Sequence, residues 1–291
     1  MTLPAFEIHS PSSVEEASGL LERHGDDAIL YSGGTELLLL MKLGFADYRH
    51  LVDVKGIAEL RRLEVVDGAL TIGAAVTHRE LELSALVRAD WPALAEMERD
   101  VANIRVRTSG TLGGNLCFSD PHSDPATFLL AADAEVVCRR DAVPRTLPLR
   151  DFLRGPFETA LEPAELLVSV RVPRTPARAA MAHKKLAFHE RPVATVSCHA
   201  RLERSRVTEA RVAVGSVGLV PIRAAGAERL LTDIEVGDDG ALAQAGKAAA
   251  AEATPIEDAN GSIEYKRTLV SVLVKRCFGE AAERAGAIAP G

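Results

Sequence analysis

The sequence predicts an α+β protein of two domains, and three observations lead to this fold class. Short apolar strands alternate with helices in the first part of the chain, a proline-rich linker crosses residues 171–180, and strands followed by helices occupy the rest. That last order is typical of an antiparallel sheet covered by helices. With 291 residues, 47% of them hydrophobic, the chain can build two cores. We expect a first domain over 1–176 and a second over 177–291.

The first elements are a helix, a strand, a glycine turn and another helix. Ser13 has a glutamate three residues on, which is the signature of a capping box, and apolar residues then recur at helical spacing until Gly25. Residues 28–31 form a short apolar strand, and the glycine turn 32–35 ends it. The apolar run 37–43, which a glycine follows, predicts a buried helix.

The remaining elements of the first domain follow the same signals. Residues 50–54 and 69–74 are short apolar runs that predict strands, the second after an Asp-Gly turn. Thr77, again with a glutamate three residues on, predicts a helix start, and a further helix is expected over 93–101. Residues 106–140 begin with a glycine-rich, polar segment, and a helix and a strand are expected after it.

The second domain is predicted from the order of its elements. A strand over 166–172 closes the first domain before the linker. Three strand segments then suggest an antiparallel meander, and three helices complete the chain. The expected strands are 184–188, 194–202 and 209–217, and the expected helices are 224–231, 241–251 and 262–285.

Charge and composition exclude several classes of function. The formal net charge is −7 with the basic residues scattered, which argues against nucleic acid as a partner. The N-terminal residues carry no basic and apolar leader, and no window reaches the ~18 apolar residues that a membrane span needs. We therefore expect a cytoplasmic protein without a membrane span. The four cysteines are far apart and form no C-x-x-C pair, so an iron-sulfur cluster would have to come from another chain.

Two segments with paired glycines carry the strongest chemical signal. They are residues 32–36, Ser-Gly-Gly-Thr-Glu, and residues 108–115, Thr-Ser-Gly-Thr-Leu-Gly-Gly-Asn. Adjacent glycines in a turn allow consecutive backbone N–H groups to point into one concavity, which suits a pyrophosphate. The hydroxyls of Ser32, Thr35 and Thr111 add donors without charge, and the helix after the first turn adds its positive end. Neither segment fits the P-loop or G-x-G-x-x-G patterns, so a dinucleotide held between two turns is the favoured interpretation.

The order of these motifs along the chain resembles one family. The segments are YSGGTELL, TIGAAVTHREL, IRVRTSGTLGGNLCFSDPHSDPA, GSVGLVPIRAAGAERLL and SIEYKRTLVSVLVKR. Together they resemble the FAD-binding medium subunit of the xanthine dehydrogenase and carbon monoxide dehydrogenase family, nearly from end to end. The resemblance implies an FAD-binding domain of the vanillyl-alcohol-oxidase (PCMH) type, with two α/β subdomains at about 1–55 and 56–176, followed by a smaller α+β domain.

The same resemblance assigns cofactor-binding residues. It implies that residues 29–36 cross the FAD pyrophosphate and that a second set holds it from the other side. Thr77, with His78 as its neighbour, corresponds to the residue near the flavin ring, Asp124 to a contact with the polar part of the cofactor, and Lys185, beside Lys184, to a basic residue at the flavin edge. The first set is Ile29, Leu30, Tyr31, Ser32, Gly33, Gly34, Thr35 and Glu36, and the second is Thr111, Gly114 and Asn115.

The resemblance also implies a place in a larger enzyme. In the family, a molybdopterin centre in a large subunit oxidises substrate, and two [2Fe-2S] clusters in a small subunit pass electrons to this FAD. The flavin then reduces NAD, dioxygen or a quinone-linked carrier. A dimer of heterotrimers is expected. No catalytic acid or base is expected on this chain, since an electron relay breaks no bond to a substrate carbon.

Alternative interpretations accompany these assignments. The run Asp120, His122 and Asp124 could ligate a metal, although Asp-Pro turns with Ser123 or Asp124 capping a helix explain it more simply. His78 stands at a helix start, where a solvated histidine is the ordinary expectation. The whole chain could instead be a self-contained FAD-dependent oxidase, or a scaffold that has lost its cofactor.

Overall fold

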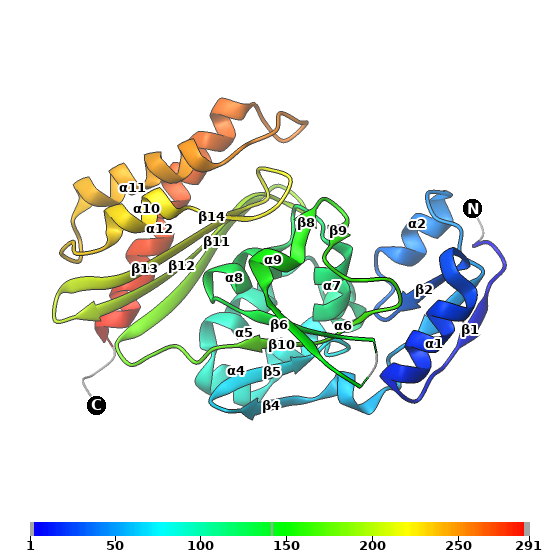
Figure 1. The fold of residues 1–291 in the computed structure, drawn as a ribbon. Coiled ribbons are helices and arrows are strands. Elements are labelled where there is room, and N and C mark those ends of the chain that lie inside the picture. The colour runs from blue at the N-terminus through cyan, green and yellow to red at the C-terminus, as the bar shows by residue number, and fades with distance from the viewer. Residues whose placement is uncertain (1–2, 141, 288–291) are drawn as a thin grey trace.

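Three larger sheets, each with its own helices, and one two-stranded hairpin make up the described part of the chain (Figure 1). The computed structural model describes residues 3–140 and 142–287. An N-terminal three-stranded sheet is followed by a five-stranded sheet and then by a four-stranded sheet with helices on one side. The predicted α+β class is confirmed: the first two sheets form the larger N-terminal part, and the antiparallel sheet with its helices forms the smaller C-terminal part.

The first sheet is parallel, with strand order β1-β3-β2. The glycine turn predicted after residue 31 follows β2 directly, and both β2 and β3 end at the same edge of the sheet. Their apolar residues pack against the first helix, whose Val14 and Ala17 are fully buried. The elements are β1 (Glu7–His9), α1 (Val14–His24), the 3-10 turn η1 (Gly25–Asp27), β2 (Ala28–Tyr31), α2 (Leu37–Leu43) and β3 (His50–Asp53).

The second sheet is antiparallel, with order β4-β5-β10-β6-β7. Its strands are β4 (Leu63–Val66), β5 (Ala69–Gly73), β6 (Glu135–Arg139), β7 (Arg145–Pro148) and β10 (Leu166–Val172), and β8 (Leu153–Gly155) pairs separately with β9 (Glu158–Thr159). The accompanying helical elements are η2 (Ala58–Arg61), α3 (His78–Leu83), α4 (Ala85–Asp90), α5 (Pro92–Asp100), α6 (Ile104–Ser109), α7 (Leu112–Phe118), α8 (Asp124–Ala131) and α9 (Leu149–Phe152).

The third sheet confirms the predicted meander and its helices. Its long strands pair antiparallel in the order β11-β12-β13-β14, and the helices pack on it to enclose a separate hydrophobic core. β11 and β13 begin before the predicted segments because the backbone pairing continues there, and both end before the predicted last residue, whereas β12 extends beyond its segment at both ends. The elements are β11 (Ala179–Ala187), β12 (Pro192–Glu203), β13 (Arg206–Gly215), β14 (Ile222–Arg223), α10 (Ala225–Leu231), α11 (Asp239–Glu252) and α12 (Ile263–Ala287).

Capping residues set the helix starts that the sequence predicts. Ser13 Oγ accepts a hydrogen bond from the Glu16 amide at 3.1 Å, which begins α1. Thr77 forms a full capping box with Glu80, which begins α3. At the other end of α2, Gly44 takes a left-handed conformation, with φ of 79°, and its N–H bonds the last turn.

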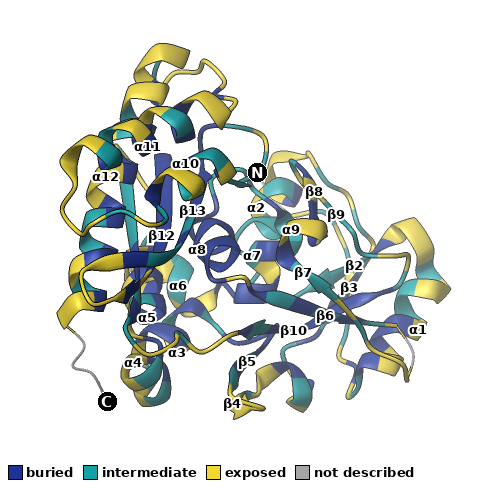
Figure 2. Ribbon diagram, turned by 60° about the vertical axis from the view of Figure 1, so that its left-hand side comes forward, coloured by how far each residue is buried: buried dark blue, intermediate teal, exposed yellow. Residues whose placement is uncertain are grey.

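Helix α8 joins the first part of the chain to the third sheet. Every residue of α8 is buried, and Figure 2 shows the helix as a dark blue element between β12, β13 and the neighbouring helices. The contact is polar at its centre: Thr127 Oγ1 lies 3.1 Å from Thr195 Oγ1, which in turn lies 3.2 Å from Ser216 Oγ. Hydrogen-bonded hydroxyls of this kind fix orientation because buried polar groups need partners.

Residues 3–140 and 142–287 include no helix that is both long enough and apolar enough to cross a membrane.

Candidate functional site

The two glycine segments lie against each other. Gly33 packs so closely on the second segment that a methyl group in its place would overlap the carbonyl of Ser109 and lie 2.6 Å from the Cα of Gly110. Close by, Thr111 Oγ1 donates a hydrogen bond of 3.2 Å to Ser32 Oγ. Both segments therefore border one site, as the sequence analysis expects, although they are about eighty residues apart in the chain.

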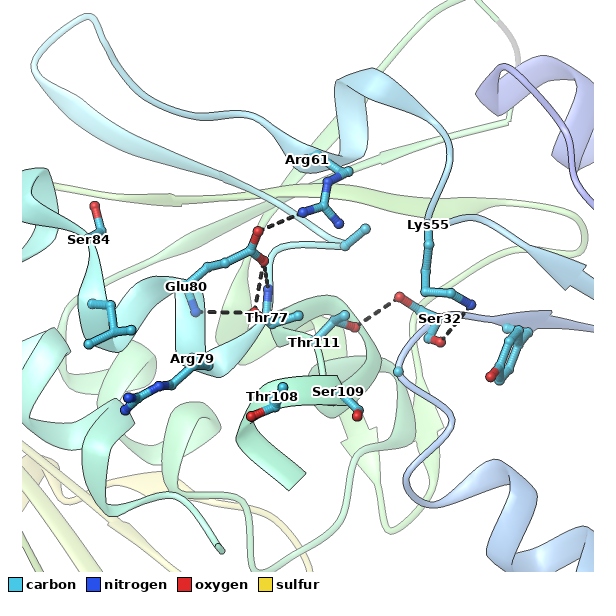
Figure 3. A pocket seen from close by; sticks show the side chains of 14 residues that line it. Ser32, Lys55, Arg61, Thr77, Arg79, Glu80, Ser84, Thr108, Ser109 and Thr111 are labelled. Carbon is cyan, nitrogen blue, oxygen red and sulfur yellow. Dashed lines mark hydrogen bonds and ion pairs between the residues drawn. The ribbon is translucent and has the colours of Figure 1, made fainter. Parts of the chain in front are cut away.

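A cavity of about 770 Å³ opens where the segments meet (Figure 3). This volume falls within the range of roughly 300–1,000 Å³ typical of small-molecule sites. Five of the expected cofactor-binding residues line it: Tyr31, Ser32, Gly33, Thr77 and Thr111. The other lining residues come from the ends of β3 and β5 and from the helices that follow them: Lys55, Arg61, Ala75, Arg79, Glu80, Leu83, Ser84, Thr108 and Ser109.

The first glycine turn offers unused backbone donors. Within the part of the chain that the structure describes, the N–H groups of Gly33, Gly34 and Thr35 donate no hydrogen bond. Gly34 takes a left-handed conformation, with φ of 69°, that L side chains rarely adopt. A run of unpaired amides at the end of a strand is a ready site for an anion, because amides removed from water need acceptors.

Two threonines line the cavity where the start of α3 meets the second glycine segment. Thr77 and Thr111 form an isolated antiparallel bridge, and the amide of His78 donates to the carbonyl of Gly110 at 3.1 Å. Each threonine also caps a helix, Thr77 at α3 and Thr111 at α7. Their positions are thus held by both backbone pairing and helix capping, which makes this wall rigid.

Lys55 is a cavity residue that the sequence analysis missed. It follows β3, and its Nζ lies 3.8 Å from the centre of the Tyr31 ring, 3.3 Å from the Ser32 carbonyl and 2.8 Å from Asp53 Oδ1. The ammonium group is therefore held over the end of β2. The topology could have revealed it, because the ends of neighbouring parallel strands meet at one edge of a sheet.

Two arginines add positive charge at the cavity, and each is paired with a carboxylate. Arg61 Nη2 lies 2.6 Å from Glu80 Oε1, and the Glu80 carboxylate also bonds the backbone N–H of Thr77 (Figure 3). Arg79 Nη1 lies 2.5 Å from Glu82 Oε1. Because these pairs are partly exposed, their main effect is to orient the guanidinium groups, and their stabilising contribution is small.

At the second glycine pair the structure differs from the sequence prediction. Gly113 and Gly114 lie in the first turn of α7, not in an open turn. Gly113 packs against β5, where a Cβ would lie 2.5 Å from Ala74 Cβ. Gly114 is exposed, and its N–H already donates to Thr111 Oγ1 at 3.1 Å. Intrinsic propensity disfavours a helix that contains two glycines, but the Thr111 cap and the close packing of Gly113 outweigh that cost.

His78 is buried, so the expectation of a solvated histidine was wrong. Its ring lies under the cavity wall with 2% exposure, and Nδ1 is 2.7 Å from Oε2 of the fully buried Glu98. A buried polar group needs a hydrogen-bond partner, and Glu98 on α5 supplies one. His78 does not line the cavity.

Asp124 and Lys185 are brought together at the contact between the two parts of the chain. Asp124 is 3% exposed, and its Oδ2 accepts a hydrogen bond of 2.7 Å from Lys185 Nζ. Its other oxygen, Oδ1, lies 3.4 Å from His183 Nε2, too poorly oriented for a hydrogen bond. Lys184 instead pairs with Glu280 on α12. Neither Asp124 nor Lys185 lines the cavity.

The run Asp120, His122 and Asp124 does not converge as a metal site would. Asp120 Oδ1 accepts from both the amide and the ring of His122, at 2.9 and 3.0 Å, whereas Asp124 turns toward Lys185. Burial alone would raise the pKa of Asp120, but the hydrogen bonds from His122 outweigh it and hold the pKa below its usual value. The helix that follows is capped by Ser123, whose Oγ accepts from Ala126 N–H and donates to Asn115 Oδ1.

The fold and the cavity define a class, an FAD-binding domain followed by a smaller antiparallel domain. Residues 4–175 match the family described as the FAD binding domain in molybdopterin dehydrogenase, and residues 180–281 match the CO dehydrogenase flavoprotein C-terminal domain. The chain therefore belongs to the FAD-binding medium subunits of the molybdenum hydroxylases and is an oxidoreductase subunit. The family resemblance noted in the sequence is confirmed.

Named relatives match over nearly the whole chain. The carbon monoxide dehydrogenase medium chain of Hydrogenophaga pseudoflava is 34% identical over 97% of this chain and 98% of its own length. The putative xanthine dehydrogenase FAD-binding subunit of Escherichia coli is 30% identical over 96% of each chain. A solved structure of the Hydrogenophaga pseudoflava carbon monoxide dehydrogenase, lacking the Mo-pyranopterin moiety of its cofactor, superimposes with a TM-score of 0.94, 35% identity and coverage of 98% and 99%.

Proposed function

We propose that the cavity binds the pyrophosphate of one FAD, with the turn after β2 on one side and the Thr77–Thr111 wall on the other. The observation that carries this proposal is the contact between the two glycine segments at one cavity. The unpaired amides of Gly33, Gly34 and Thr35 supply donors, and the ammonium of Lys55 supplies charge. Such an arrangement fits a diphosphate because amide donors and a nearby cation both favour phosphate oxygens.

The remaining assignments follow the path of an extended dinucleotide from this point. We assign the pyrophosphate crossing to the strand end and turn, the second side of the cradle to α7, and the flavin end to the start of α3. Asp124, with its unpaired buried oxygen, is assigned to the polar part of the cofactor, and Lys185, its partner, to the flavin edge. The full set is Ile29, Leu30, Tyr31, Ser32, Gly33, Gly34, Thr35, Glu36, Thr77, His78, Thr111, Gly114, Asn115, Asp124 and Lys185.

The proposed role is to relay electrons. Bound FAD exchanges electrons with one-electron and two-electron partners, and this chain's residues bind it, orient it and shield it from water. We propose that electrons arrive from [2Fe-2S] clusters of a small subunit, after oxidation of substrate at a molybdopterin centre of a large subunit. They leave to NAD, dioxygen or a quinone-linked carrier. The named relatives are medium or FAD-binding subunits of dehydrogenases, which supports assembly with further subunits. We propose that the assembly is a dimer of heterotrimers.

We also propose that the chain divides near residue 176, with subdomains at about 1–55 and 56–176 and a C-terminal domain over 177–291. Two separate hydrophobic cores support this division. The linker at 173–178 lies between β10 and β11, where the chain leaves one sheet for another.

The purified chain alone tests the proposal. We expect a yellow protein with about one FAD per chain, released on denaturation, and no oxidation of alcohols or amines by the chain alone. Reduction of the flavin should require an added reductant or the partner subunits. A folded chain that takes up no added FAD would contradict the proposal, and substrate oxidation by the chain alone would favour the self-contained oxidase.

A further inference from the structure

Three histidines from three different elements gather beside the first sheet, and none of them lines the cavity. His9 lies on β1, His24 ends α1 and His50 begins β3. One ring nitrogen from each lies within 4.8 Å of the others, and His9 Nε2 is 3.0 Å from His50 Nδ1. The rings of His24 and His50 stack with their centres 3.8 Å apart. No other group of this kind occurs within residues 3–140 and 142–287.

The sheet register explains why these side chains meet. β1 and β3 are parallel neighbours, with Glu7 opposite His50 and His9 two residues further on. Side chains alternate between the faces of a strand, so Glu7, His9 and His50 share one face. Val52 shares it too and is fully buried with Val14 of α1. Helix α1 therefore covers this face, and its last residue, His24, reaches the histidine pair.

We propose that His9, His24 and His50 form a binding site for a transition-metal cation, of which Zn²⁺ is the natural occupant. Imidazole is a preferred ligand of Zn²⁺, and three protein ligands with one further position are a common zinc arrangement. Two nitrogens bonded to one Zn²⁺ at ~2.0–2.1 Å lie roughly 3.3 Å apart in tetrahedral geometry. The observed spacing of 3.0 Å between His9 and His50, and of at most 4.8 Å for the third ring nitrogen, is close to this distance. The stacked rings of His24 and His50 would turn until a nitrogen of each points at the ion.

A carboxylate lies where it can complete the coordination or offset the charge. Glu7 Oε2 is 3.6 Å from His50 Nδ1 and 4.0 Å from His9 Nε2. The Glu7 side chain is 74% exposed, so it can swing toward the cation, and the histidines, about one-fifth exposed at His9 and His50, leave an entry path from solvent. One carboxylate offsets half of the charge of Zn²⁺, so the site offers the ligands, a counter-charge and the entry path that a zinc site needs.

The site would tie together the first sheet, which is the smallest of the three larger sheets. Its strands are only three or four residues long, and β1 is an edge strand. Small units of this kind commonly rely on a disulfide or a structural metal, and none of the four cysteines lies in it. A metal joining β1, α1 and β3 would hold the first strand in place without touching the FAD cavity.

Titration of Zn²⁺ into the full-length chain tests the proposal. The protein, with any histidine tag removed and metals stripped by a chelator, should bind one Zn²⁺ near neutral pH by calorimetry. His24→Gln and His50→Gln should each weaken binding at least about tenfold, since even a residue that supports a ligand contributes that much. His189→Gln is the matched control, because His189 is exposed and distant in the chain, and it should bind as tightly as the unchanged protein.

X-ray absorption at the zinc edge identifies the ligands directly. We expect a nitrogen and oxygen shell at ~2.0–2.1 Å, lost in His24→Gln. A sulfur shell at ~2.3 Å would place the ion on cysteine and overturn the proposal, as would equal zinc affinity in the unchanged protein and both variants. Circular dichroism and FAD content of each variant show that it is folded, and Glu7→Gln with His9→Gln replace any variant that is not. Because FAD content is read separately, failure here leaves the proposed function standing.

Discussion

The two glycine pairs of this chain look alike in sequence but have different roles in the structure. Gly33 and Gly34 lie in an open turn, where their N–H groups have no acceptor within the described residues. Gly113 and Gly114 lie in the first turn of α7, where one glycine packs on Ala74 and the other bonds the Thr111 cap. One pair leaves backbone free for a ligand, and the other allows a helix to approach a strand.

Glycine, which has no side chain, therefore has two separate roles in this chain. In a turn it permits a left-handed conformation and exposes amides; at a contact it permits close approach of two backbones. Gly33 combines them, because it lines the cavity and also touches Ser109 and Gly110. Substitutions at these positions should therefore separate loss of FAD from loss of stability.

Gly33→Ala should have the largest effect on cofactor binding. Its methyl group would overlap the Ser109 carbonyl and push the two segments apart, so we expect the chain to be purified almost without FAD. The absorbance of the flavin per chain measures this. Gly56→Ala is the control, because a Cβ there meets no atom within 4 Å, and it should keep its FAD. Full FAD content in Gly33→Ala would remove the turn from the site.

Gly113→Ala should mainly reduce stability. A Cβ would lie 2.5 Å from Ala74 Cβ, and overpacking of this kind costs about 1–3 kcal/mol of unfolding free energy. Denaturant unfolding of the FAD-free protein measures the loss. The folded fraction should still bind FAD; if FAD is lost without any change in stability, Gly113 faces the ligand and not the strand.

Gly114→Val should weaken FAD binding by roughly tenfold, about 1.4 kcal/mol, with a smaller effect on folding than Gly113→Ala. Gly114 is exposed, and a Cβ there would come within 2.9 Å only of Thr111 Oγ1. Fluorescence titration of the FAD-free chain with FAD measures the affinity. Unchanged affinity would exclude α7 from the pyrophosphate cradle.

Thr111→Val should have the smallest effect of the four variants, because valine keeps the shape of the threonine side chain and removes only two hydrogen bonds. The Gly114 N–H loses its cap and the bond to Ser32 is lost, which costs about 1 kcal/mol of unfolding free energy. Thr111→Ser retains the hydroxyl and should restore most of the stability. Equal melting temperatures for the two variants would show that the cap contributes nothing.

Local sequence signals predicted much of the fold correctly. The helix over 37–43 has the predicted bounds, but the prediction that it is buried was wrong, because only Met41 is buried and Leu39 and Leu43 are exposed. The strand over 28–31 also has its predicted bounds, and the caps at Ser13 and Thr77 form as expected. These features depend on neighbours within one or two turns. Helix α7 was missed because two glycines disfavour a helix, and because one of the contacts that hold it, between Gly113 and Ala74, joins segments separated in sequence.

The residues of the candidate site also form two groups, those that local sequence signals predict and those that only the packing reveals. The glycine turn and the two threonines could be recognised from their residue types, but Arg61 and Arg79 could not, because nothing near them in sequence marks a cavity. Lys55 could be found only from the pairing of β2 with β3. His78 was expected in solvent and is buried, because its partner Glu98 comes from a helix twenty residues later. Burial and charge pairing depend on which elements pack together.

The sequence by itself determined the order of elements, the helix caps, the family and the residue types that can bind a dinucleotide, because periodicity, capping and motifs are local properties of the chain. Only the tertiary structure decided that the glycine segments touch, that Asp124 meets Lys185, and that three histidines converge. Those facts join residues tens of positions apart, and their distances are set by the packing of sheets and helices, which no local pattern encodes.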